Sequence, residues 1–158
     1  MGKQRPTSLT WRLMRRMSTR VIRLVAAGHG PAKVVLVLTT TGRKSGLPRQ
    51  TPLQYEQVGD DYYIASARGP QADWFRNLQA NPRVEVLLQG RQFPAQAQAV
   101  TDPSRIADFL ALRLERHPLM VGLIMRLEGF PLRYTRLDLE KFAAGKALAV
   151  LHPIPPDE

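Results

Sequence analysis

The stretch TTTGRKSGLPR, residues 39–49, decides the fold because it forms a tight basic turn between two strand-like runs. Residues 34–41 (VVLVLTTT) are aliphatic and β-branched, and residues 49–58 (RQTPLQYEQV) resume a strand-like mixture. Gly42 and Gly46 permit the positive φ angles that tight turns use. The pattern therefore predicts a β-hairpin with a basic tip.

Three cations, Arg43, Lys44 and Arg49, crowd this turn, and no acidic residue is close in sequence. Cations held this close repel one another unless solvent or a bound anion intervenes. The turn therefore predicts an anion site, with a solvated basic turn as the alternative. A phosphate loop of the nucleotide-binding type is excluded, because that loop runs from Gly-Lys-Ser/Thr into a helix. Here Lys44-Ser45 follows Arg43 and precedes a strand-like run.

Length and composition favour a single compact domain, since the 158 residues are 44% hydrophobic. No run approaches the roughly 18 apolar residues of a membrane span, and no signal peptide is expected. With 0 cysteines, the sequence excludes a disulfide framework, a thiolate metal site and a cysteine nucleophile. The histidines are scattered, so no metal site is expected.

The net charge of +10 is concentrated at one end of the chain. Residues 1–55 hold 11 of the 23 Lys and Arg and none of the 13 Asp and Glu. Within them, residues 8–27 predict a basic amphipathic helix, with apolar side chains at spacings of three and four. Such a helix docks on its own domain or lies at an anionic membrane surface. Nucleic acid is a weaker third option, because the chain shows no DNA- or RNA-binding signature.

The remaining pattern predicts a mainly β fold of the α+β class, a small barrel of five or six antiparallel strands with added helices. Further strands are expected at residues 61–67, 83–89, 92–100 and 132–139. Helices are expected at residues 74–80, 103–116 and 119–127. Asp73 is expected to cap the first of these helices, and Asp102 or Thr101 the second. The expected organisation is an N-terminal helix within residues 1–30, the barrel at 31–150 and a Pro-rich tail at 151–158.

A second group of polar and aromatic residues follows the strand at 61–67. Ser66 and Arg68 stand near its end, and Trp74 and Asn77 share a helix face. Together they offer a hydroxyl, a cation, an aromatic face and an amide. The alternative is that these residues have structural roles only: Trp74 belongs to the hydrophobic core, Asn77 caps the helix and Arg68 is solvated.

Three motifs in a fixed order carry a family resemblance: TTTGRKSGLPRQTPL, then YYIASARG, then DWFRNLQANPRVEV. Over residues 33–100 the chain resembles the deazaflavin-dependent nitroreductase family, whose members bind coenzyme F420. The resemblance implies a split β-barrel of the flavin-binding, pyridoxamine-phosphate oxidase-like type. It also implies hydride transfer from reduced F420 to a quinone, a nitroaromatic compound or a similar electron-poor acceptor.

The resemblance also assigns cofactor-binding residues. The turn that would hold the phosphate and its neighbouring groups contributes Arg43, Lys44, Ser45 and Arg49. The next strand would line the cofactor with Gln50, Thr51, Pro52 and Leu53. A strand end and a helix would flank the deazaflavin ring with Ala65, Ser66, Ala67, Trp74, Phe75 and Asn77. These types fit, because phosphate and an acidic oligoglutamyl tail call for fixed cations and a planar tricycle needs an apolar wall.

Two departures from the family pattern concern the tail and the acceptor. Relatives carry a lysine and paired glycines after the Ala-Ser, whereas this chain has Ala67-Arg68-Gly69 and a shorter loop. Arg68 would take the place of that lysine. On the acceptor side, Tyr134 is the sole tyrosine in the C-terminal part, and with Ser66 it is the catalytic candidate. Tyr134 would bind an acceptor oxygen or supply a proton, with strand packing as the alternative.

Three classes of function stay open. The leading one is an F420-dependent oxidoreductase acting on a small-molecule acceptor. The second is a split-barrel protein that binds FMN, another flavin or a tetrapyrrole. The third is a basic module without redox work, which binds a membrane surface through residues 8–27 or binds nucleic acid. The expected location is the cytoplasm, with peripheral attachment to the inner face of the membrane and a homodimer left open.

Overall fold

The computed structural model describes residues 20, 35–66 and 68–156, and the expected helix at 8–27 therefore lies outside the described residues except for Arg20. The strands are β1 (Val35–Thr41), β2 (Pro48–Gln54), β3 (Glu56–Val58), β4 (Asp61–Ser66), β5 (Arg83–Leu88), β6 (Arg91–Val100) and β7 (Ala147–Pro153). The helices are α2 (Asp73–Ala80), α3 (Pro103–Arg116), α4 (Pro118–Leu127) and α5 (Arg136–Ala143), with a 3-10 turn at Gly69–Gln71.

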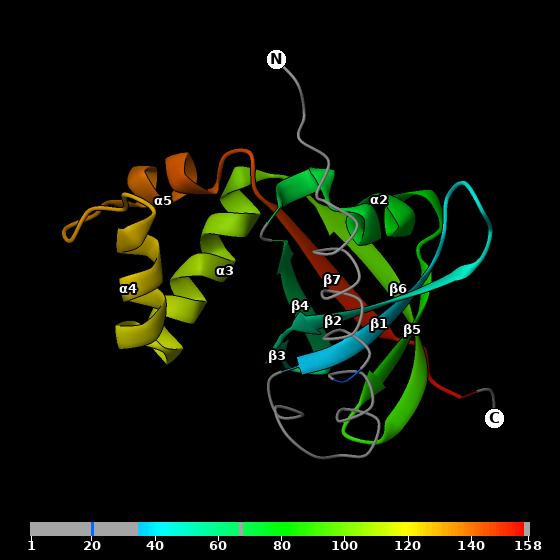
Figure 1. Cartoon of the computed structure of the whole chain (residues 1–158). Coiled ribbons are helices and arrows are strands. Elements are labelled where there is room, and N and C mark those ends of the chain that lie inside the picture. Colours follow the sequence, from blue (N-terminus) through cyan, green and yellow to red (C-terminus); the bar gives the residue numbers. More distant parts are fainter. Residues whose placement is uncertain (1–19, 21–34, 67, 157–158) are drawn as a thin grey trace.

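One antiparallel sheet runs in the order β2-β1-β5-β6-β7-β4-β3. Its two edge strands, β2 and β3, are consecutive in the chain and separated by Tyr55 alone. A single residue joins the opposite edges only if the sheet curls round on itself, and Figure 1 shows this curled half-barrel. The mainly β, split-barrel prediction is confirmed, and the expected strand at 49–58 is divided at Tyr55.

The predicted basic hairpin is present as β1 and β2, which pair from Val35 opposite Gln54 to Thr41 opposite Pro48. β1 is held on its other side by β5. Because β1 is paired on both sides and buries Leu36, Val37 and Leu38, the hairpin is anchored in the barrel rather than projecting freely. The basic tip therefore has a fixed position relative to the helices.

Each face of the sheet has its own hydrophobic core. On one face α2 covers the sheet, and that core includes Trp74, Phe75 and Leu78. On the other face lie α3, α4 and α5, with Ile106 and Leu139 in the core. Figure 1 shows this division, with α2 at one end of the sheet and the three later helices grouped at the other.

The C-terminal part differs from the sequence expectation. Residues 132–139 do not form a strand; Thr135 accepts a hydrogen bond from the Asp138 backbone, Asp138 accepts one from the Thr135 backbone, and this capping box begins α5. The last strand is β7, and it lies between β6 and β4. Residues 151–153, expected in the tail, belong to it.

The sequence pattern does not predict β7 as a strand, because this strand is buried on both faces. Ala147, Ala149 and Leu151 join the core under α2, whereas Leu148 and Val150 join the core under α3 and α5. Such a strand shows a continuous apolar run instead of alternation, and a short run of this kind is ambiguous between strand and helix.

Two helix-start predictions have opposite outcomes. Asp102 caps α3 through a hydrogen bond from the Ser104 backbone N–H, as expected. Asp73 does not cap α2; the cap position is Ala72, and Asp73 is the first helical residue. In the part of the chain that is described, no helix is long and apolar enough to cross a membrane.

Candidate functional site

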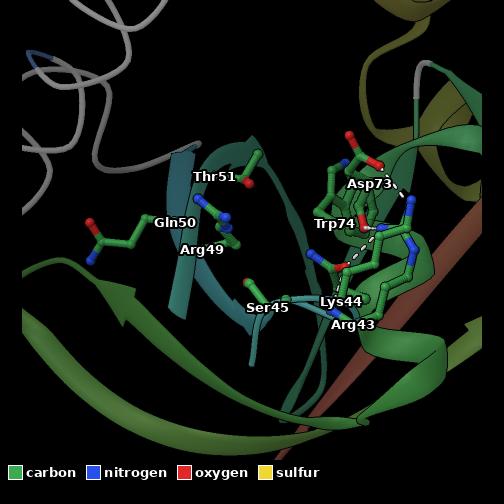
Figure 2. Close-up of a pocket in the computed structure, with 10 residues that line it drawn as sticks. Arg43, Lys44, Ser45, Arg49, Gln50, Thr51, Asp73 and Trp74 are labelled. Atoms are coloured by element: carbon green, nitrogen blue, oxygen red, sulfur yellow. Dashed lines mark hydrogen bonds and ion pairs between the residues drawn. The ribbon is translucent and has the colours of Figure 1, made fainter. Parts of the chain in front are cut away.

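A cleft of about 470 Å³ opens between the tip of the β1–β2 hairpin, the start of β2 and the first turns of α2. Figure 2 shows side chains from the hairpin and from α2 facing each other across it. Its lining residues are Gly42, Arg43, Lys44, Ser45, Arg49, Gln50, Thr51, Asp73, Trp74 and Asn77. The first and third sequence motifs, which are separated in the chain by residues 54–72, thus form one site.

The hairpin tip is closed by its own hydrogen bonds. The Gly42 N–H donates to the Leu47 carbonyl at 2.8 Å, and the Gly46 N–H donates to the Gly42 carbonyl at 2.8 Å. The Leu47 N–H donates to the Ser45 hydroxyl oxygen at 3.2 Å. Gly46 has a φ of +69°, and a Cβ at Gly42 would lie 2.6 Å from the Ser45 hydroxyl. Gly46 is therefore required by its left-handed backbone conformation, whereas Gly42, which has no positive φ, gives the Ser45 hydroxyl its place against the backbone of the turn.

Arg43 forms hydrogen bonds and an ion pair with residues of α2, unlike the other two cations of the turn. Its guanidinium donates to the Asn77 amide oxygen at 2.9 Å and to the Asp73 carboxylate at 3.0 Å. Its backbone N–H donates to the same Asn77 oxygen at 3.2 Å. No acidic residue is close to the three cations in sequence, but α2 brings the Asp73 carboxylate to Arg43.

Asn77 is the buried centre of this arrangement, with 5% of its surface exposed. Besides accepting from Arg43, its amide nitrogen donates to the Thr40 hydroxyl at 3.3 Å, and Thr40 is also buried. Asn77 does not cap the helix; it connects α2 to the end of β1 and to the basic turn. A buried amide with both ends satisfied sets the distance between hairpin and helix.

Lys44 and Arg49 are exposed and form no ion pair or hydrogen bond with the residues that the structure describes. In Figure 2, Arg49 and Thr51 project from one side of β2, and the Gln50 side chain extends from the opposite side, as alternation along β2 requires, although all three residues line the cleft. The cleft therefore presents three cations against a single carboxylate. This donor set suits an oxyanion ligand.

Trp74 provides the apolar wall of the cleft. The residue is largely buried, with 9% of its surface exposed, and its ring meets the Phe75 ring edge-on with centroids 5.8 Å apart. Phe75 itself is fully buried in the core. An aromatic side chain fixed in this way offers a rigid surface to a flat ligand.

The remaining predicted residues lie away from the cleft lining. The Ser66 hydroxyl is buried and donates to the Gly69 carbonyl at 2.7 Å, so it stabilises the turn after β4. Arg68 is exposed. Ala67 lies outside the described residues. Predicted residues that the structure describes but does not place in this lining are Pro52, Leu53, Ala65, Ser66, Arg68, Phe75 and Tyr134.

Tyr134 is the predicted site residue that lies most clearly apart from the cleft. Its ring packs against Phe130, with centroids 5.0 Å apart, in the connection between α4 and α5. In Figure 1 this connection and the β1–β2 hairpin lie at opposite ends of the molecule. The catalytic role of Tyr134 stays a prediction to which the position of this side chain adds no support.

Sequence reasoning missed two lining residues, Gly42 and Asp73. The sequence pattern assigns Gly42 only a conformational role in the turn. The pattern predicts Asp73 as a helix cap, whereas it lies in the first turn of α2, where a carboxylate is favoured by the helix dipole without capping. Its position one turn before Asn77 was the available signal, since both side chains then share a helix face.

Comparison with known proteins matches this site to a family. The sequence model described as "F420H(2)-dependent quinone reductase" matches residues 11–118, more than half of the chain. Over 68 residues the chain is 41% identical to an F420H(2)-dependent quinone reductase from Mycobacterium tuberculosis and to a putative one from Mycobacterium bovis. These alignments cover 41% of this chain and 46% of each relative, so the chain spans less than half the length of the curated relatives it matches.

Solved structures show the same fold at low identity. A structure described as an F420-H2 dependent reductase is 21% identical, with a TM-score of 0.50, and the match covers 76% of this chain and 95% of that one. A putative pyridoxamine 5'-phosphate oxidase from Listeria innocua is 14% identical, with a TM-score of 0.52, covering 88% and 94%. Both likenesses establish the split-barrel fold.

Proposed function

Since this chain belongs to the F420H(2)-dependent quinone reductase family, we propose that it is an oxidoreductase that uses reduced coenzyme F420 to deliver hydride to a quinone, a nitroaromatic compound or a similar electron-poor acceptor. The observation that carries the proposal is the cleft. Eight residues assigned to the cofactor by the resemblance line it together: Arg43, Lys44, Ser45, Arg49, Gln50, Thr51, Trp74 and Asn77.

The donor set of the cleft fits the phosphodiester of F420. Lys44 and Arg49 have no anionic partner among the described residues, and Arg43 is held beside them by Asn77. A hydrogen bond from a charged donor to an anion contributes about 1.5–3 kcal/mol. The Asp73 carboxylate opposes an anion here, but it is itself neutralised by Arg43 at 3.0 Å.

The chain supplies binding and orientation. When bound, F420 provides the hydride chemistry, and the protein aims its reactive carbon and excludes water. Trp74 offers the flat apolar wall, and the fixed cations keep the phosphate end in place. No acid or base is needed among the cleft residues for this task. The Ser66 hydroxyl donates to the Gly69 carbonyl, and its catalytic role stays a prediction.

The decisive experiment is a fluorescence titration of the protein with F420, with FMN titrated in parallel. The charge-removing variant Lys44→Gln/Arg49→Gln is expected to bind F420 at least tenfold more weakly, because two charge-assisted contacts are lost. The control Arg83→Gln/Arg91→Gln removes the same charge from exposed positions on β5 and β6 and is expected to bind within twofold of the unsubstituted protein.

Absence of F420 binding, or tighter binding of FMN, would contradict the proposal. Activity is measured as the oxidation of reduced F420 upon addition of a quinone. The acceptor is expected to be a small molecule, in keeping with the family. A homodimer is also part of this proposal, and light scattering of the purified protein tests it separately.

A further inference from the structure

Exposed apolar side chains gather at one end of the molecule. Among the described residues nine large hydrophobic side chains are exposed, and all but Leu47 lie between residues 119 and 137. The α4–α5 surface consists of Leu119, Met120, Leu123, Ile124, Leu127, Leu132, Tyr134 and Leu137. Single exposed apolar residues are ordinary, but a concentration of this kind marks an interaction site.

Helix α4 is apolar on nearly all sides, since PLMVGLIMRL contains one charged residue, Arg126. Only Val121, Gly122 and Met125 are buried against the rest of the protein. Leu119 and Leu127, at the two ends of the helix, are 88% and 79% exposed. A helix that is apolar all round is normally surrounded by protein or by lipid. In Figure 1, α3 lies between α4 and the sheet, so α4 has protein on its inner side.

The charges on this surface identify the chemistry of its partner. Glu128 is paired with Lys146 at 3.3 Å, and Arg136 is paired with Asp108 and Glu140. Two arginines remain, Arg126 and Arg133, for which no hydrogen bond or ion pair is formed with a described residue. The uncompensated charge at this surface is therefore positive. It attracts an anionic partner and opposes a second copy of the same surface face to face.

We propose that the α4–α5 surface binds the interface of an anionic lipid bilayer. The leucine and isoleucine side chains enter the boundary between headgroups and acyl chains, and Arg126 and Arg133 extend their guanidinium groups to lipid phosphates. In Figure 1, helices α4 and α5 lie at the opposite end of the molecule from the tip of the β1–β2 hairpin, whose residues line the cleft, so lipid contact leaves the cleft open. The proposal does not depend on which cofactor binds there.

The test uses the absence of cysteine in the natural chain. The single variant Leu123→Cys, carrying an environment-sensitive fluorophore, reports on the outer face of α4. The matched variant Gln96→Cys reports on an exposed position of β6. With vesicles of mixed phosphatidylcholine and phosphatidylglycerol, emission from position 123 is expected to rise and shift to the blue, and emission from position 96 to stay unchanged. Vesicles of phosphatidylcholine alone are expected to give a smaller response.

Vesicle sedimentation with charge variants provides the second measurement. Arg126→Gln/Arg133→Gln is expected to raise the lipid concentration needed for half-binding about tenfold, because each basic residue near an anionic surface contributes to attachment. Arg83→Gln/Arg91→Gln, with the same net charge, is expected to match the unsubstituted protein.

Three results would overturn the proposal. The first is a label at position 123 that does not respond to anionic vesicles, including the case in which residues 8–27 alone attach the chain. The second is equal binding by the two charge variants. The third is a concentration-dependent blue shift at position 123 without vesicles, which would identify a second copy as the partner.

Discussion

At the scale of single residues, the cations of the basic turn divide into two roles. Arg43 has its hydrogen bonds directed to Asn77 and Asp73, and it connects hairpin to helix. Lys44 and Arg49 keep their charge available toward the cleft. Three cations that look equivalent in sequence thus differ because one of them reaches partners on α2.

The substitution Asp73→Asn is expected to increase F420 affinity about two- to fivefold. It removes the negative charge that opposes the cofactor phosphate and partly neutralises Arg43, which Asn77 continues to hold in place. Because Asp73 is 80% exposed, the free energy of unfolding should change by no more than about 0.5–1 kcal/mol. Fluorescence titration measures the affinity, with Asp60→Asn as the control of equal charge on an exposed residue. Weaker binding by Asp73→Asn would show that the carboxylate orients Arg43 for the ligand.

The substitution Asn77→Ala is expected to lower the free energy of unfolding by about 1–3 kcal/mol and to weaken F420 binding in the same variant. It leaves the buried Thr40 hydroxyl and the Arg43 backbone N–H without their partners. Chemical denaturation and cofactor titration measure the two effects. Gln79→Ala, at an exposed position of the same helix, should change neither by a comparable amount. Unchanged binding by Asn77→Ala would separate Asn77 from the site.

At the scale of elements, the largest departure from the sequence reading is at residues 132–139. Strand-like composition predicted a strand, but the Thr135 and Asp138 capping box begins α5. Local hydrogen bonds at a helix start thus prevailed over the β-propensity of a few side chains. The spacing of Thr135 and Asp138 was a signal of this in the sequence.

The substitution Thr135→Ala tests this helix start. Loss of the side-chain cap is expected to lower the free energy of unfolding by about 1 kcal/mol. Thr135→Ser, which keeps the hydroxyl, should stay close to the unsubstituted protein, and Thr101→Ala serves as an exposed threonine control. F420 affinity should be the same in all three, since α5 lies on the far side of the sheet from the cleft. Equal stability of Thr135→Ala and Thr135→Ser would argue against a functioning cap.

At the scale of the whole molecule, a group of charges joins the barrel to the later helices. Glu56 on β3 accepts a hydrogen bond from Arg116 at 3.0 Å and contacts His117 at 3.3 Å. Burial alone would raise the pKa of the Glu56 carboxyl, but the hydrogen bonds from Arg116 and His117 outweigh it and hold that pKa below its ordinary value. The carboxylate therefore stabilises the folded chain.

Because the folded-state pKa of Glu56 is lowered, its stabilisation is present above the ordinary glutamate pKa and is lost as the pH falls through the folded value. Glu56→Gln is expected to cost roughly 1 kcal/mol at neutral pH. This difference from the unsubstituted protein should shrink below about pH 4. Thermal unfolding of both proteins across the acidic range measures it. A difference that is independent of pH would mean that the charge of Glu56 contributes nothing.

The sequence by itself determined the hairpin, most strand positions, the basic turn and the family, because these depend on local patterns and on ordered motifs. Alternation, turn glycines and β-branched runs are sufficient where a strand has one polar face or a sharp boundary. Six of the described residues assigned to the cofactor nonetheless fall outside the cleft lining, because a motif also contains neighbouring residues that pack in the fold, such as Phe75 and Ser66.

Only the tertiary structure decided the position of β7, the partners of Arg43 and the separation of Tyr134 from the cleft. β7 is buried on both faces by helices distant in sequence, so its pattern alone could not identify it. Asp73 and Asn77 lie 30 and 34 residues from Arg43 in the chain, so local sequence patterns do not predict their contacts with it. Long-range contacts of this kind depend on the packing of the whole sheet and its helices.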